Sequence, residues 1–429
     1  GVINTWDVSG VTDMSNLFKD KSTFDSDISN WNVASVTNMG GMFEGANIFN
    51  QDISGWSVGA VTDMNSMFTH ANLFNADISG WDVSNVTTMQ EMFRAANVFN
   101  QDISSWDVSK VTAMDEIFSL ATVFNQDISS WDVSKVTTMN SIFNSAQAFN
   151  QNLTAWNVSA ATQMISMFSE ASAFNGDISG WDVGHVTNMQ RMFYRATVFN
   201  SDISAWNVSA VTSMHGSFEL TDFFNQDISS WDVSSVTTME DLFRSTKVFN
   251  QDIGVWNISG VTNMKRMFYS AKGFNGAINA WDVSSVTTMY DMFKYASDFD
   301  SDIGDWDVSS VTTMRGMFQG PHAFNQDISA WNVSNVNDME SMFQYNAHFN
   351  HEIGGWDVSK VTKMNYMFWS TSSSVFNGDI SGWDVSSVTD MNSMFQIAPV
   401  FNSDISGWNV SKVTNMDSMF SQAVAFNQD

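Results

Sequence analysis

The chain has 429 residues, more than one globular domain of ordinary size, and 43% of them are hydrophobic, so the chain is not disordered. A formal net charge of −29 argues against nucleic acid and anionic membrane surfaces as partners, and apolar runs of only a few residues exclude a transmembrane segment. The absence of cysteine excludes disulfides, zinc–thiolate sites and a cysteine nucleophile.

One unit of 25 residues recurs along the chain. We number its positions 1 to 25 from Phe99 to Val123, FNQDISSWDVSKVTAMDEIFSLATV. Trp recurs at position 8 from Trp6 to Trp408 and accounts for 17 of the 18 tryptophans, which gives 17 turns. Phe at positions 1 and 20 and Met at position 16 are equally regular. Because a unit this short cannot bury these residues alone, we expect stacked units to share a continuous core, and not a cofactor site.

Each unit predicts the same order of elements. Positions 24 to 4 form a return turn, where the nearly constant Asn at position 2 is expected to form an amide ladder. Positions 5 to 10, Ile-x-x-Trp-x-Val, favour a short parallel strand with one buried face. Thr at position 14 suits a helix N-cap, and the apolar positions 16, 19, 20 and 23 have helical spacing. The prediction is therefore an α/β solenoid with 17 turns of one short parallel strand plus one short helix.

The motif W-D-V-S-x-V-T-x-M-x-x-M-F-x-x-A-x-x-F-N-x-D-I-S covers essentially the whole sequence. It closely resembles the repeat of BspA-like leucine-rich-repeat surface proteins, and more narrowly the 25-residue repeat first noted in mycoplasma lipoproteins. The resemblance implies a right-handed leucine-rich-repeat-like solenoid at the cell surface, with adhesion or host contact as its role. We expect a single solenoid over residues 1–429, with a two-residue insertion within 371–374, as part of a longer chain.

Charge is divided unevenly within the unit. All 17 Lys and Arg residues fall at positions 12 to 24, whereas 28 of the 46 acidic residues fall at positions 1 to 11. Position 4 is mostly Asp, and position 9 is Asp or Asn. With turns ~4.8 Å apart, like charges in one column would repel by about 0.9 kcal/mol per pair even in water. Bound cations, raised pKa values or hydrogen bonds from nearby serines are expected to offset this repulsion.

Three interpretations of these aspartates remain open. They cap the backbone through Asx turns, they form a row of Ca²⁺ sites between turns, or they bind a basic protein or peptide. Hard cations prefer carboxylate and carbonyl oxygens, so Ca²⁺ is the one cofactor that the sequence suggests. The candidate Ca²⁺ ligands are Asp102, Asp107, Asp127, Asp132, Asp177, Asp182, Asp227 and Asp232.

Positions 17, 18, 21, 22 and 24 vary between turns, and a binding site is expected among them. Between Arg191 and Trp369 these positions become richer in basic and aromatic residues, types that are enriched at protein contacts. Trp369 is the one tryptophan outside the position-8 column, and it lies beside the insertion. The candidate binding residues are Arg191, Tyr194, Arg195, Arg266, Tyr269, Tyr295, Tyr345, Tyr366 and Trp369.

The sequence offers no catalytic set that stands out, since no phosphate-binding glycine loop or unique Ser-His-Asp group can be argued. We therefore predict a protein that is not an enzyme, located outside the cell or at its surface. Its predicted role is adhesion or binding of a protein or glycan ligand through an extended face. The alternative is a structural subunit of an extracellular filament or surface layer, built by end-to-end or lateral self-association and dependent on Ca²⁺ if the aspartates bind it.

Overall fold

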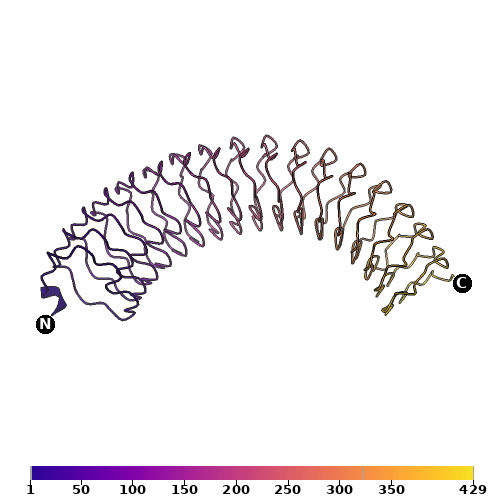
Figure 1. Cartoon of the computed structure of the whole chain (residues 1–429), viewed down its shortest axis with the longest axis horizontal. Helices are drawn as coiled ribbons and strands as arrows, with labels where there is room; N and C mark the ends of the chain where they lie inside the picture. Colours follow the sequence, from indigo (N-terminus) through magenta and orange to yellow (C-terminus); the bar gives the residue numbers. More distant parts are fainter. Residues whose placement is uncertain (1, 321, 429) are drawn as a thin grey trace. The chain divides into compact units, whose positions relative to one another are not determined.

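The protein winds into turns that stack on one another. The computed structural model describes residues 2–320 and 322–428, and these form two compact units, Gly1–Val211 and Thr212–Asp429. Backbone hydrogen bonds join residues one repeat apart in both units, from the Thr62 amide to the Thr37 carbonyl at 2.8 Å and from Thr262 to Thr237 at 3.0 Å. Each unit is therefore a repeat solenoid, and Figure 1 shows its successive turns.

Regular secondary structure is almost absent from the described residues. Their one named element is the 3-10 helix η1, Ile3–Thr5. Isolated parallel bridges join residues at position 15 of successive turns, such as Thr88 to Ala113 and Thr238 to Asn263. The predicted helix over positions 14–23 and the predicted strand over positions 5–10 are therefore wrong, whereas the parallel stacking of turns is confirmed.

The segment predicted to be a helix is a ladder between turns. Amides at positions 16, 18, 20 and 22 donate to carbonyls of the next turn, as Gly41 does to Asn65 at 2.7 Å. Amides at positions 19, 21 and 23 donate to the carbonyl three residues earlier in their own turn, as Ala46 does to Phe43 at 3.0 Å. Every amide of residues 39–46 has a partner in this way, with the Gly40 amide bound to a side chain.

The spacing of Met and Phe does not distinguish the ladder from a helix. Positions 16, 19, 20 and 23 point inward in both, and Met114, Ile117, Phe118 and Ala121 are all fully buried. A helix satisfies its amides within one segment, whereas the ladder needs a neighbouring turn. Because stacked turns supply that neighbour throughout a unit, the ladder can replace the helix at no loss of hydrogen bonds.

Positions 18 and 22 adopt the left-handed backbone conformation. Gly41 and Gly45 do so with φ of 64° and 69°, and so do non-glycine residues such as Tyr345 at 64° and Tyr366 at 62°. This conformation costs an L-residue roughly 1–2 kcal/mol. The hydrogen bonds and packing between turns therefore offset a strain that recurs at 28 non-glycine residues.

The aromatic columns form the core of each unit, as predicted. Trp131 is 2% exposed, and its Nε1 donates to the Ile103 carbonyl of the preceding turn at 3.1 Å. Phe118 stacks on Phe124 with ring centroids 3.9 Å apart and on Phe93 at 5.8 Å. Each aromatic side chain thus contacts both its own turn and a neighbouring turn.

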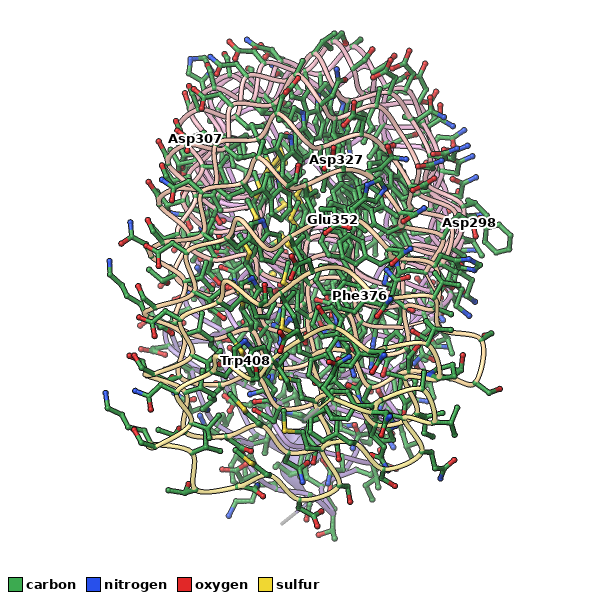
Figure 2. The ribbon with its side chains drawn as sticks, turned by 90° about the vertical axis from the view of Figure 1, so that its right-hand side faces the viewer. Asp298, Asp307, Asp327, Glu352, Phe376 and Trp408 are labelled. Atoms are coloured by element: carbon green, nitrogen blue, oxygen red, sulfur yellow. The ribbon has the colours of Figure 1, made fainter. Side chains whose placement is uncertain are left out.

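The insertion does not interrupt these columns. Phe376 follows the extra residues within 371–374 and still stacks on Phe349 at 6.2 Å. In the unit Thr212–Asp429, Phe376 lies inside the winding, whereas Asp298 and Asp307 lie on its outside (Figure 2). Within 371–374, Thr371, Ser372 and Ser373 are exposed and Ser374 is buried, so the segment with the added residues lies largely at the surface.

Two polar columns also join the turns. The Asn100 amide donates to the Asn75 side-chain oxygen at 2.9 Å, which confirms the predicted ladder at position 2. The Thr87 hydroxyl donates to the Thr62 carbonyl at 3.1 Å. The predicted role of this threonine as a helix N-cap is therefore wrong, because its partner lies in the preceding turn.

Candidate functional site

The aspartates at positions 4 and 9 bind the backbone of their own turn. Asp102 Oδ1 accepts the Ser104 amide at 2.9 Å, and Asp107 Oδ1 accepts the Ser109 amide at 3.0 Å. These are Asx turns, in which the side chain takes the place of a backbone acceptor. The other candidate aspartates accept the amide two residues later in the same way, at 2.9–3.0 Å: Asp127, Asp132, Asp177, Asp182, Asp227 and Asp232.

Hydrogen bonds from serine outweigh the repulsion along the aspartate columns. The hydroxyl and amide of Ser104 lower the pKa of Asp102 below its usual value. For Asp127, the amide and hydroxyl of Ser129 lower the pKa more than burial and the charge of Asp102 raise it. Serine hydrogen bonds are therefore confirmed as an offset to the repulsion at Asp102 and Asp127, and the expectation of raised pKa values is wrong for these two aspartates.

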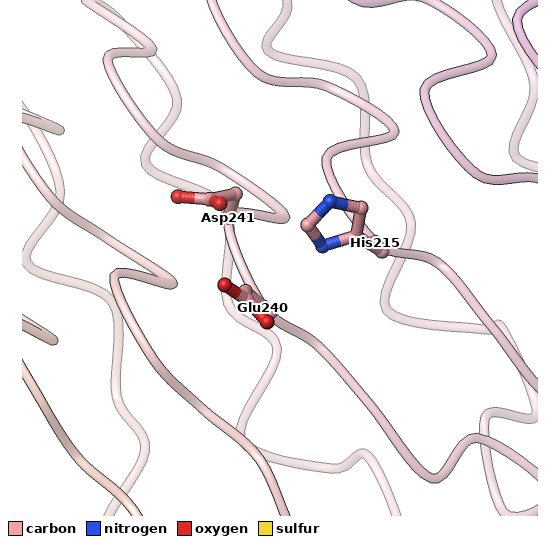
Figure 3. Close-up of side chains that lie close together, drawn as sticks. All are labelled: His215, Glu240 and Asp241. Carbon is pink, nitrogen blue, oxygen red and sulfur yellow. The ribbon is translucent and has the colours of Figure 1, made fainter.

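His215, Glu240 and Asp241 are the one group of possible metal ligands that the described residues bring within 4.8 Å of one another (Figure 3). Arg266 donates to both oxygens of Asp241 at 2.8 and 2.7 Å, and Lys265 Nζ lies 3.0 Å from Glu240 Oε1. Burial raises the pKa of Glu240, but hydrogen bonds led by that of Lys265 bring it below its usual value. The carboxylates thus belong to an ion-pair network, and a metal ion would have to displace two cations.

The predicted binding residues occupy the outward columns of the ladder segment. We define the ladder face as the side chains at positions 17, 18, 21 and 22 of the unit Thr212–Asp429. Arg191, Tyr194 and Arg195 hold the equivalent positions in the unit Gly1–Val211, where the two guanidinium groups lie 5.4 and 5.2 Å from the Tyr194 ring centroid. The ladder face itself includes Arg266, Tyr269, Tyr295, Tyr345, Tyr366 and Trp369.

The aromatic residues of the ladder face form two clusters. Tyr269 meets Tyr295 edge to face, with centroids 5.6 Å apart. Trp369 packs against Tyr345 at 5.0 Å and against Tyr366 at 5.5 Å. Burial raises the pKa of both Tyr269 and Tyr345. The structure thus brings five of the predicted residues, which come from four turns, into two compact groups.

A hollow of about 570 Å³ lies on the ladder face beside the second cluster. Tyr366 and Trp369 line it, together with the ion pair of Arg315 and Glu340, whose closest atoms are 2.9 Å apart. Most of the other lining residues carry amides or hydroxyls. They are Lys294, Gln319, Ser341, Gln344, Asn392, Ser393, Gln396, Asp417 and Ser418.

The amides of this hollow are not among the predicted binding residues. Gln319, Gln344 and Gln396 share position 21 with Trp369, so this column reads Gln, Gln, Trp, Gln in successive turns. The signal is therefore present in the sequence, but it becomes visible only when one column is followed down the stack.

A second hollow of about 370 Å³ lies beside the insertion and is lined by His322, Tyr345, His348 and Thr371, among others. His322 is 1% exposed, and its Nε2 lies 3.1 Å from the Gln319 carbonyl, so this nitrogen carries the proton and donates it. Burial lowers the pKa of His322 to about 4. The imidazole is therefore neutral at neutral pH.

The chain belongs to the family described as "Mycoplasma protein of unknown function, DUF285". Its family model matches residues 1–106, 70–181, 126–222, 164–279, 199–304, 267–374 and 349–429, which together span the sequence. This match confirms the resemblance to the mycoplasma-type surface-protein repeat. The comparison with curated proteins returned no match. Among the described residues, no helix has the length and hydropathy needed to cross a membrane.

Several solved leucine-rich-repeat structures are similar to this chain at low identity. A leucine-rich cell surface protein of Faecalibacterium prausnitzii is 11% identical with a TM-score of 0.29, and the match covers 80% of this chain and 82% of that one. A leucine-rich repeat protein of Bacteroides ovatus is 10% identical with a TM-score of 0.21, covering 70% and 87%.

The match to the TLR13–ssRNA13 complex has 7% identity and a TM-score of 0.19. It covers 92% of this chain but 59% of the TLR13 chain, so the sequence spans little more than half of that protein's length. Identities and TM-scores this low transfer neither a partner nor a site to this chain.

Proposed function

We propose that this chain is an extracellular or cell-surface repeat protein that binds a protein or glycan ligand on its ladder face. The observation that carries the proposal is the 570 Å³ hollow lined by Tyr366 and Trp369. Other columns serve the solenoid itself, since they fill the core or close Asx turns. The solenoid has no comparable need for Trp369 and Tyr366 at outward positions, where both are half-buried, and Trp and Tyr are enriched at binding sites.

The proposed scaffold is a single right-handed leucine-rich-repeat-like solenoid of 17 turns that forms part of a longer surface protein. A binding role fits the hollow better than a catalytic one, because two of its four charged residues, Arg315 and Glu340, are committed to an ion pair. The net charge of −29 also favours partners other than nucleic acid.

The competing proposal is a filament or surface-layer subunit whose aspartate columns bind Ca²⁺. Light scattering at micromolar and millimolar chain concentration, with a thermal melt in EDTA and then in millimolar CaCl₂, separates the two. A binding protein is expected to stay monomeric with an unchanged melting temperature, because the aspartates already bind backbone amides. Polymerisation, or a large rise in melting temperature with Ca²⁺, would reject the binding proposal in favour of the filament.

A further inference from the structure

The chemistry of the ladder-face hollow narrows the class of ligand. Ligand pockets for drug-like and apolar molecules are lined mainly by hydrophobic side chains. This hollow instead combines two aromatic rings with amides and hydroxyls, among them Gln344, Asn392 and Gln396. Each amide offers both donors and acceptors, so the lining matches a ligand that is rich in hydroxyl groups.

The charges of the hollow also point to an uncharged ligand. Lys294 and Arg315 contribute two positive charges, and Glu340 and Asp417 contribute two negative charges, so the lining is formally neutral. Arg315 is paired with Glu340 at 2.9 Å, which leaves little excess charge of either sign. A basic peptide would be attracted more strongly by the aspartate columns, and an anionic polymer would be repelled by the protein as a whole.

Two lining residues have hydrogen-bonding atoms that the protein does not use. Trp369 Nε1 and Asn392 Oδ1 are buried and have no hydrogen-bond partner among the described residues. Such groups are rare in folded proteins and are costly unless something else satisfies them. Because both atoms are buried, a ligand reaches them only if a neighbouring side chain moves, so they show unsatisfied polarity beside the hollow and are not themselves assigned as sugar contacts.

The shape of the hollow favours a linear ligand. Its lining residues come from consecutive turns between Lys294 and Ser418, which at ~4.8 Å per turn extends over roughly 25 Å of the stack. A chain of similar units can therefore lie along the ladder face and contact the same column in each turn.

We propose that this hollow binds a neutral, unbranched oligosaccharide. One sugar ring packs against Trp369 and Tyr366 through its C–H face, and the hydroxyls of neighbouring sugars bond to the amides of Gln344, Asn392 and Gln396. This inference rests on the proposed binding function and specifies the ligand class for the same site. A neutral polar peptide is the competing ligand, but it offers no flat C–H face to the half-buried indole of Trp369.

Calorimetric titration of the full chain with cellohexaose, laminarihexaose, maltohexaose and chitohexaose tests the proposal. At least one is expected to bind, with a Kd about tenfold or more higher for Trp369→Ala, as for a central aromatic contact. Trp369→Phe should recover part of the affinity because it retains a ring. Phe223→Ala is the control, since Phe223 is an exposed aromatic residue of the same unit that does not line the hollow, and it should leave the Kd unchanged.

Acrylamide quenching provides a second readout. The position-8 tryptophans are buried except at Trp6, so the bound sugar should protect mainly the Trp369 emission. The proposal would be overturned if no hexasaccharide gave a heat of binding or protected Trp369 from acrylamide quenching. It would also be overturned if Trp369→Ala left the binding intact. So would binding of a neutral Ser/Gly/Asn peptide of matching length in place of the sugars. In each case, if light scattering shows that the chain is monomeric, the oligosaccharide proposal fails but the proposed binding function does not.

Discussion

Replacing Trp131 by Ala is expected to destabilise the unit Gly1–Val211 by about 3–5 kcal/mol. The indole is 2% exposed, stacks 6.4 Å from Trp106 and 6.0 Å from Phe118, and donates to the Ile103 carbonyl. The substitution leaves a cavity and removes one of the two donors of the Ile103 carbonyl, which keeps its bond from the Trp106 amide at 3.2 Å. Because a solenoid is stabilised by contacts between neighbouring repeats, the loss acts on both adjacent turns.

Urea and thermal unfolding, followed by circular dichroism, measure this effect. An early transition or a lowered midpoint is expected for Trp131→Ala, since long repeat arrays need not unfold as one cooperative unit. Trp6→Ala is the matched control, because Trp6 occupies the same column but is 58% exposed. It should change the stability by less than about 1 kcal/mol. Equal unfolding midpoints for the two variants would contradict the claim that the buried tryptophans of this column stabilise the contacts between turns.

Acid should destabilise the protein through His322. The imidazole is buried, and burial lowers its pKa from 6.5 to about 4 in the folded state. Between these values the unfolded chain binds a proton that the folded protein does not, so the free energy of unfolding falls as the pH drops from about 6.5 to about 4. The interval of about 2.5 pH units corresponds to a loss of about 3 kcal/mol.

His322→Gln should remove this contribution. Relative to wild type, the variant is expected to gain about 3 kcal/mol of stability as the pH falls from about 7 to about 4, measured by urea unfolding. His348→Gln is the control, because His348 lines the same hollow but is exposed, and it should retain the wild-type pH dependence. If His322→Gln and wild type lose stability in parallel, the buried neutral imidazole is not the cause.

The sequence predicts those features that depend on side chains repeating at one phase. The buried Trp and Phe columns, the Asn ladder and the stacking of turns follow from the period alone. The pairing of Asp102 with Ser104 also follows from local chemistry, because an Asx turn needs only the next two residues. These predictions are confirmed.

The conformation of positions 14–23 could not be predicted from spacing. Met114, Ile117 and Phe118 would point inward from a helix as well, and propensity does not reveal that a neighbouring turn supplies the hydrogen bonds. Thr87 illustrates the same limit, since its hydroxyl has a partner only when turns are stacked. Of the residues that line the hollow, Tyr366 and Trp369 were predicted as binding residues. The amide residues were not predicted, because they come from several different turns and meet only when the turns are stacked.

The ladder between turns determines which side chains form the ladder face. Far-ultraviolet circular dichroism of the full chain is the most direct test of whether positions 14–23 form this ladder or a helix. We predict a spectrum without the double minimum of an α-helix, because the one helix among the described residues is η1, Ile3–Thr5. A spectrum with the helix content of a two-turn helix in every repeat would contradict the ladder and the surface that it presents.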